Sequence, residues 1–102
     1  AGLTNLESLY LGGNKITDIS PLAGLTHLKR LTLSDNKISD LSPLAGMTNL
    51  ESLELGFNQI TDISPLAGLT NLELLYFGGD KISDDHKAML KKALPKCEIS
   101  FD

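Results

Sequence analysis

The sequence has no tryptophan and is poor in several residue types on which many functions depend. Its single cysteine, Cys97, excludes an intramolecular disulfide and a multi-cysteine zinc cluster. His27 and His86 are the only histidines, so acid–base chemistry has few groups to use. No apolar run approaches the roughly 18 residues that a membrane-spanning helix needs. We therefore expect no membrane insertion.

Basic residues are also in deficit, with 9 lysines and arginines against 13 acids and a net charge of −4. A nucleic-acid binder needs a clustered basic surface to neutralise phosphates. Lys87, Lys91, Lys92 and Lys96 do cluster near the end of the chain, but no aromatic residues interleave with them. Such a group is typical of a solvated helix face. We expect no nucleic-acid partner.

What the 102 residues do contain is an internal repeat. The chain aligns with itself after a shift of 22 residues, and the first and third copies differ at four positions. After residue 83 the fourth copy departs from the pattern. The predicted organisation is a repeat region, 1–83, followed by a C-terminal cap, 84–102. The repeat region divides into 1–5, 6–27, 28–49, 50–71 and 72–83.

Each copy contains a segment in which apolar and polar residues alternate, such as Ser8-Leu9-Tyr10-Leu11. This alternation predicts a short strand with its leucines on the inner side. Equal spacing then stacks the strands in parallel, about 4.8 Å apart. The predicted inner columns are Leu6, Leu28, Leu50 and Leu72; Leu9, Leu31, Leu53 and Leu75; Leu11, Leu33, Leu55 and Phe77; and Ile16, Ile38, Ile60 and Ile82.

An asparagine follows each of the first three strands, at positions 14, 36 and 58. Its short amide can satisfy backbone groups of adjacent turns, which predicts an internal asparagine ladder that ends at Asp80. On the return side, a Ser-Pro pair starts each turn, at Ser20, Ser42 and Ser64. A glycine follows each proline within three residues, so the sequence predicts short 3₁₀ turns.

Aspartates recur at the same spacing, at positions 18, 40, 62 and 84. One interpretation is a stacked carboxylate column that binds calcium, with Asp18, Asp40 and Asp62 as the candidate ligands. The other is that each carboxylate caps its own short turn or accepts from backbone amides. We favour the second and expect no metal or cofactor. Stacking is also expected to raise the pKa of these carboxyls.

The C-terminal residues predict a helix and a final strand that together close the core. Ser83 or Asp84 can cap the helix, and the order of acids then lysines matches the helix dipole. Pro95 ends the helix, and alternation then predicts a strand that brings Phe101 onto the core. His86 is expected to be solvated and Cys97 to be buried. The predicted apolar helix face is Ala88, Met89, Leu90, Ala93 and Leu94.

These repeats resemble the 22-residue leucine-rich repeats of bacterial internalins and are equally similar to those of the protein phosphatase-1 regulatory subunit. The motif N-x-I-[TS]-D-[IL]-S-P-L-A-G-[LM]-T carries the resemblance. It implies an α/β solenoid with parallel strands on a concave face, 3₁₀ turns on the convex face and a helix-plus-strand cap. An internalin-like chain would be bacterial and secreted or at the cell surface, whereas the phosphatase regulator is intracellular, so the compartment stays open.

Residues 1–5 repeat the sequence of 67–71 and are interpreted as the tail of a repeat whose strand is missing. The first inner leucines would then line an open edge, where another chain can pair. This predicts a fragment of a longer repeat protein, an engineered cut, or self-association through that edge. The residues of the predicted self-association edge are Leu6, Leu9 and Leu11.

The outward strand positions vary between copies and carry the candidate binding residues. Tyrosine and arginine are frequent interface anchors, and an outward leucine is unusual on a polar surface. The alternative interpretation is ordinary strand surface, which also favours aromatic residues. The candidate patch is Tyr10, Arg30, Thr32, Glu54, Phe57, Leu74 and Tyr76.

No catalytic constellation is found, so the predicted function is not enzymatic. The resemblance implies a module that binds a protein or peptide on its concave sheet. A second hypothesis is a structural or assembly element that forms homo-oligomers through its N-terminal edge. A third is a calcium- or glycan-binding surface domain.

Overall fold

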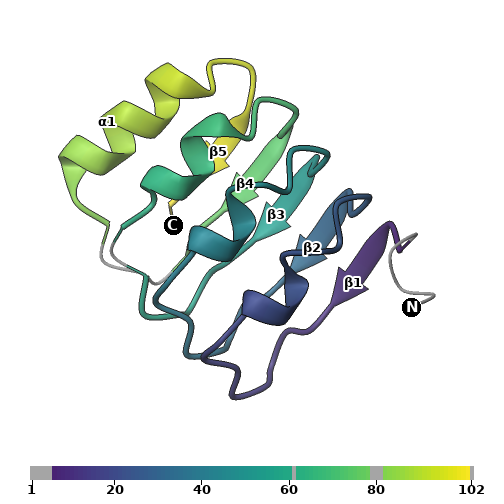
Figure 1. Cartoon of the computed structure of the whole chain (residues 1–102). Coiled ribbons are helices and arrows are strands. Elements are labelled where there is room, and N and C mark those ends of the chain that lie inside the picture. The colour runs from purple at the N-terminus through teal and green to yellow at the C-terminus, as the bar shows by residue number, and fades with distance from the viewer. Residues whose placement is uncertain (1–5, 61, 79–81, 102) are drawn as a thin grey trace.

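The computed structural model describes residues 6–60, 62–78 and 82–101. In this part of the chain, five short strands lie side by side in one open sheet of order β1-β2-β3-β4-β5, and every neighbouring pair is parallel (Figure 1). The strands are β1 (Ser8–Tyr10), β2 (Arg30–Thr32), β3 (Ser52–Glu54), β4 (Leu74–Tyr76) and β5 (Glu98–Ser100).

A second row of elements packs behind the sheet (Figure 1). It consists of the 3₁₀ turns η2 (Ser20–Leu22), η3 (Ser42–Leu44) and η4 (Ser64–Gly68), and each begins with the predicted Ser-Pro pair. The helix α1 (Asp84–Ala93) continues this row and packs against η4. The predicted α/β solenoid, with strands on one face and 3₁₀ turns on the other, is confirmed.

The repeat period sets the register of the sheet. Leu9 pairs with Leu31, and Leu53 with Leu75, so the leucines of successive strands stack in one column. Leu31, Leu53 and Leu75 are at most 1% exposed. Burying a leucine side chain contributes roughly 1.5–3 kcal/mol. Stacking of the copies therefore contributes stabilisation that a single copy cannot supply alone.

The first copy is less buried than the copies that follow. Leu6, Leu9 and Leu11 are half-buried, whereas Leu28, Leu31 and Leu33 are at most 1% exposed. β1 is the first strand of the sheet, and its described neighbours lie on one side only. In the columns of Leu6, Leu9 and Leu11, the side chains of the first copy are therefore less buried than those of the second. The first copy is also the place where the sequence predicts an open edge.

The predicted asparagine ladder is present between the first and second copies and between the second and third copies. Asn36 Oδ1 accepts from the Ile16 backbone N–H at 3.1 Å, and Asn58 Oδ1 accepts from that of Ile38 at 3.0 Å. Asn36 Nδ2 also donates to the Leu33 carbonyl oxygen at 2.8 Å. Each amide thus connects its own turn to the preceding copy. The predicted end of the ladder, Asp80, lies outside the described residues.

The cap helix corrects two predictions. The Ser83 Oγ accepts from the His86 backbone N–H at 3.2 Å, so Ser83 is the helix cap. Leu90 is fully buried, and His86, one turn earlier on the same face, is half-buried rather than solvated. Ala88 is exposed, and its assignment to the apolar face was wrong. Two residues span about 200° of a helix, so position 88 lies opposite Leu90.

The final strand closes the C-terminal end of the core. β5 pairs with β4 in parallel, with Ile99 beside Leu75. The Phe101 ring then stacks on Phe77, with centroids 5.6 Å apart and an interplanar angle of 6°. The prediction that Phe101 packs on the core is confirmed. This contact joins the last repeat to the cap.

Candidate functional site on the concave sheet

The outward side chains of the sheet form two parallel rows, on the face that points away from the 3₁₀ turns; we call this the concave face. Because the strands pair in register, each row crosses the whole sheet. One row is Ser8, Arg30, Ser52, Leu74 and Glu98; the other is Tyr10, Thr32, Glu54, Tyr76 and Ser100. The rows bring six of the seven candidate residues onto one surface.

Exposed apolar side chains gather on this face. Among the described residues, the large hydrophobic side chains that reach solvent are Tyr10 (67% exposed), Phe57 (56%) and Leu74 (38%). Tyr10 and Leu74 belong to the two rows, and Phe57 lies in the turn that leaves β3. Tyr76 is half-buried in the same row as Tyr10. Water-exposed aromatic groups of this kind are typical anchors for a partner.

The charged candidates differ in how they are held. Thr32 Oγ1 donates to Glu54 Oε2 at 3.0 Å, which fixes one carboxylate oxygen in the middle of its row. Arg30 is exposed, and among the described residues its guanidinium has no hydrogen-bond or ion-pair partner. A free guanidinium can bind a carboxylate with two parallel hydrogen bonds. The concave face therefore offers the Glu54 carboxylate as a hydrogen-bond acceptor held in place. It also offers the Arg30 guanidinium as a donor that has no partner among the described residues.

Phe57 reaches the surface from an unusual backbone conformation. Its φ is 61°, as is that of Asp35 at the equivalent position, whereas Gly13 has φ 77° there. A left-handed conformation costs most residues about 1–2 kcal/mol, and glycine adopts it freely. The Phe57 backbone N–H donates to the Gly78 carbonyl oxygen, which holds the turn. A strained position that carries an exposed ring points to a role outside folding.

The repeated aspartates act on the backbone. Asp18, Asp40 and Asp62 each accept from the N–H of the serine two residues later, at 2.9, 2.9 and 3.0 Å. These backbone bonds, with a smaller contribution from the serine hydroxyl, hold the pKa of each carboxyl below its usual value. The carboxylates of Asp18 and Asp62 do raise the pKa of Asp40, as stacking predicts, but the hydrogen bonds to Ser42 lower it by more.

No three metal-ligating side chains come together in the part of the chain that the structure describes. The hydrogen bonds from Ser20, Ser42 and Ser64 place one oxygen of each carboxylate on its own turn. Those bonds support the backbone interpretation of Asp18, Asp40 and Asp62 over the calcium interpretation.

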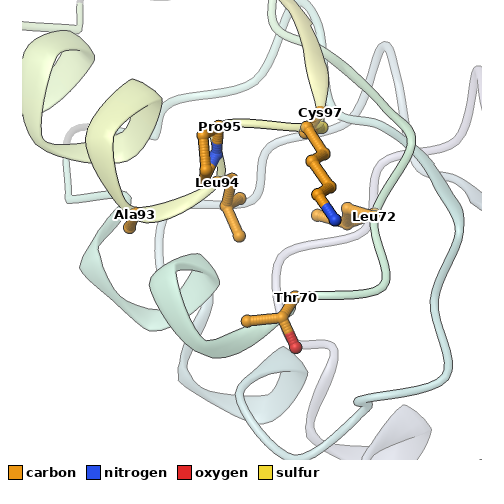
Figure 2. A pocket seen from close by; sticks show the side chains of 7 residues that line it. Thr70, Leu72, Ala93, Leu94, Pro95 and Cys97 are labelled. Carbon is orange, nitrogen blue, oxygen red and sulfur yellow. The ribbon is translucent and has the colours of Figure 1, made fainter.

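A small cavity of about 240 Å³ lies between the end of α1 and the last repeat (Figure 2). Leu72, Leu94 and Cys97 line it, together with Thr70, Ala93, Pro95 and Lys96. Burial and the adjacent Glu98 carboxylate raise the pKa of the half-buried Cys97 thiol. A protonated thiol is a poor nucleophile, so the raised pKa disfavours reactivity of Cys97 in this cavity.

Comparison with known sequences identifies the repeats. A family model described as leucine rich repeats (2 copies) matches residues 4–46 and 48–87. The chain belongs to the leucine-rich repeat family. Proteins built from such repeats typically use the extended surface of the solenoid to bind other proteins. None of the helices in the described ranges has the length and apolar character needed to cross a bilayer.

Solved structures of other leucine-rich repeat proteins superpose closely on this chain. Internalin C2 from Listeria monocytogenes is 43% identical with a TM-score of 0.88, over 96% of this chain and 42% of that one. A second internalin from the same species is 36% identical with a TM-score of 0.89, over 95% and 28%. A leucine-rich repeat protein from Leptospira interrogans is 39% identical with a TM-score of 0.85, over 94% and 25%.

The chain spans less than half the length of each of these structures. The internalin resemblance inferred from the sequence is confirmed at the level of the family. A comparison with curated protein sequences found no significant match.

The rows also contain residues that repeat analysis missed. Glu98 and Ser100 extend the two rows onto β5. β5 pairs with β4 at a separation of 24 residues rather than 22, so its outward positions do not align with the repeat. The alternation of Cys97, Ile99 and Phe101 was the signal that could have assigned Glu98 and Ser100 to the concave face.

Proposed function

We propose that this leucine-rich repeat chain is a non-catalytic module that binds a protein or peptide on its concave sheet. One observation carries the proposal: the large apolar side chains exposed among the described residues all lie on the concave face or in the turn that borders it. The proposed contact residues are Tyr10, Arg30, Thr32, Glu54, Phe57, Leu74 and Tyr76.

The spacing of the two tyrosines suits a partner that crosses the strands. Tyr10 and Tyr76 occupy one row and are separated by three strand intervals, about 14 Å at 4.8 Å each. An extended peptide covers that distance with about four residues. Glu54 lies between the tyrosines in their row, and Arg30 lies on β2 in the neighbouring row, so that both can bind groups of opposite charge on the partner.

Peptides selected from a displayed random library on the wild-type chain provide the test. Replacing Tyr10→Ser together with Tyr76→Ser removes both anchors, and we expect affinity to fall by at least about tenfold. The matched control is Ala23→Ser with Ala45→Ser, two exposed positions in the row of 3₁₀ turns. Selected peptides that bind the tyrosine variant as tightly as wild type rule out the concave face.

A second candidate function is assembly through the β1 end of the solenoid. Its support is the half-burial of Leu6, Leu9 and Leu11, in columns where the following copies are fully buried. A shallow apolar cavity of about 160 Å³ lies beside them, lined in part by Leu11, Ile16 and Leu22. An apolar end whose strand has neighbours on one side only among the described residues favours pairing with another strand.

Light scattering across a concentration series tests the assembly role. The role predicts a mass that rises with concentration for the wild type and stays monomeric for Leu9→Lys. Circular dichroism of the variant checks that it is folded. A wild-type chain that remains monomeric throughout the series eliminates self-association, whatever the variant does.

A further inference from the structure

The carboxylate of Glu54 lies between two neighbours in its row on the concave face. The strand register places Glu54 beside Thr32 on β2 and beside Tyr76 on β4. The Thr32 hydroxyl donates to Glu54 Oε2 at 3.0 Å, and the half-buried carboxylate has no other hydrogen bond or ion pair among the described residues. A carboxylate accepts hydrogen bonds through both of its oxygens, so Glu54 Oε1 can accept one from a partner.

The ring of Tyr76 is held on the neighbouring strand because a glycine makes room for it. Strands β3 and β4 are about 4.8 Å apart. A Cβ built on the buried Gly56 would meet Tyr76 Cε2 at 2.9 Å, so the ring packs against the backbone two residues after Glu54. Positions two residues apart in a strand share one face. Gly56 therefore positions an aromatic ring beside the Glu54 side chain.

The surroundings of Glu54 are acidic. Residues 38–80 contain no lysine, arginine or histidine and six acidic residues. Glu51 and Glu73 precede β3 and β4, and the Glu73 backbone N–H donates to the Glu51 carbonyl oxygen at 2.7 Å, so the two residues lie side by side. Arg30 lies on β2 in the other row and forms no ion pair with Glu54 within the described ranges. The charge of Glu54 is therefore left for a partner to balance.

From this arrangement we infer that Glu54 and Tyr76 together bind a cationic side chain, a lysine or an arginine of a basic peptide partner. The inference rests on the proposed function, which takes the concave face as the peptide-binding surface. The carboxylate supplies a charge-assisted hydrogen bond, and the negative face of an aromatic ring attracts a cation. The pair thus specifies the charge of the partner at this point of the sheet.

Other occupants fit these two groups less well. Calcium and magnesium ions take about six or more oxygen ligands, and no three metal-ligating side chains gather in the described part of the chain. An apolar side chain of a partner would remove water from the Glu54 carboxylate without balancing its charge, which costs free energy. An acidic side chain would add repulsion. The same carboxylate that attracts a cation therefore also rejects these alternatives.

The experiment uses the whole chain and one defined probe, an end-blocked peptide that alternates arginine and leucine. A comparison probe has citrulline in place of every arginine, which keeps the size of the side chain and removes its charge. Binding of both probes is measured by fluorescence anisotropy at one ionic strength. We expect the wild type to bind the arginine probe about fivefold to tenfold more tightly than the citrulline probe.

A substitution that keeps the shape of the site isolates the carboxylate. Glu54→Gln removes the charge but keeps an oxygen that can accept from the Thr32 hydroxyl. We expect this variant to lose most of the preference for the arginine probe. The matched control is Asp85→Asn, which makes the same change in net charge at an exposed position of α1. The control should keep the preference within about twofold of wild type.

A second pair of variants separates the aromatic ring from simple apolar contact. Tyr76→Phe keeps an aromatic face, whereas Tyr76→Leu keeps an apolar side chain without one. Because only the ring attracts a cation, Tyr76→Leu is expected to bind the arginine probe about threefold more weakly than Tyr76→Phe does. The citrulline probe should distinguish the two variants less.

Four results would overturn the inference: no binding of the arginine probe to wild type, equal affinity for the two probes, equal effects of Glu54→Gln and Asp85→Asn, or equal binding of the arginine probe to Tyr76→Leu and Tyr76→Phe. Failure of the proposed function gives a different result, in which library-selected peptides bind the Tyr10→Ser, Tyr76→Ser variant as tightly as wild type. Selected peptides that need both tyrosines, without a preference for the arginine probe, retain the concave face and reject the cation site.

Discussion

The side-chain amide of Asn36 donates a hydrogen bond of 3.1 Å to the carbonyl oxygen of Leu11, which lies 25 residues earlier in the chain. The bond links two copies of the repeat through a buried polar group, since Asn36 is only 7% exposed. The same Nδ2 also donates to the Leu33 carbonyl oxygen within its own copy. One amide thus satisfies the backbone of two neighbouring turns, where strand pairing has ended.

Replacing Asn36→Ala removes a buried amide that bonds two copies and leaves the Ile16 backbone N–H without its acceptor, while the Leu11 and Leu33 carbonyl oxygens keep the Asn14 and Asn58 amides as donors. We expect the free energy of unfolding to fall by about 3 kcal/mol. Asn14→Ala is the matched comparison, because the exposed Asn14 donates only to Leu11 and Gly12 within its own turn, and we expect a loss of about 1 kcal/mol. Urea denaturation measures both. Equal losses would show that bonding between copies contributes nothing extra.

Phe57→Gly separates stability from binding at one position. The glycine relieves a left-handed backbone worth about 1 kcal/mol, and its greater unfolded-state entropy offsets about half of that gain. We expect a net stabilisation of about 0.5 kcal/mol in urea denaturation, with weaker binding of concave-face peptides. Asp35→Gly is the control: aspartate tolerates the same φ of 61°, so we expect little change in either property. A Phe57→Gly variant that binds normally would remove the ring from the interface.

Gly56 lies where two copies approach closely. A Cβ built there meets the Gly78 carbonyl oxygen and Tyr76 Cε2, each at 2.9 Å. Gly56→Ala is therefore expected to destabilise the chain by about 1–3 kcal/mol. At Gly24 a Cβ meets nothing within 4 Å, so Gly24→Ala is expected to be neutral or slightly stabilising. Thermal unfolding of the two variants makes the comparison, and similar melting temperatures would contradict it.

The aspartate turns predict acid sensitivity. The backbone N–H bonds lower the folded-state pKa of Asp18, Asp40 and Asp62 below the ordinary 3.8 of the unfolded chain. Their stabilisation is therefore complete well above pH 3.8 and is lost as the pH falls through the lowered folded-state values. Urea midpoints should be flat near neutrality and fall in acid.

The combined variant Asp18→Asn, Asp40→Asn and Asp62→Asn isolates this contribution. An asparagine oxygen can still accept the serine N–H, but it does not titrate in this range. The acid-induced fall in the urea midpoint should therefore be shallower in the variant than in wild type. An unchanged slope would assign the acid sensitivity to other carboxyls.

The repeat was enough to predict the inner columns, because a period of 22 residues aligns Leu31 with Leu53 and Leu75 wherever consecutive copies stack. The same argument placed Tyr10, Thr32, Glu54 and Tyr76 in one row. It failed where the period ends: Glu98 and Ser100 joined the rows without being predicted, and Ala88 was assigned to the wrong helix face.

The sequence by itself thus determined the strand positions, their register and the buried leucine columns, since these follow from local alternation repeated at constant spacing. Only the tertiary structure decided how much each equivalent residue is buried, because burial depends on which copies are present on either side. It also decided that the aspartates bind their own turns, that Phe57 adopts a left-handed backbone and that Lys87 and Lys91 meet at the Phe101 ring. Those features depend on directions and distances between copies, which a pattern of letters does not contain.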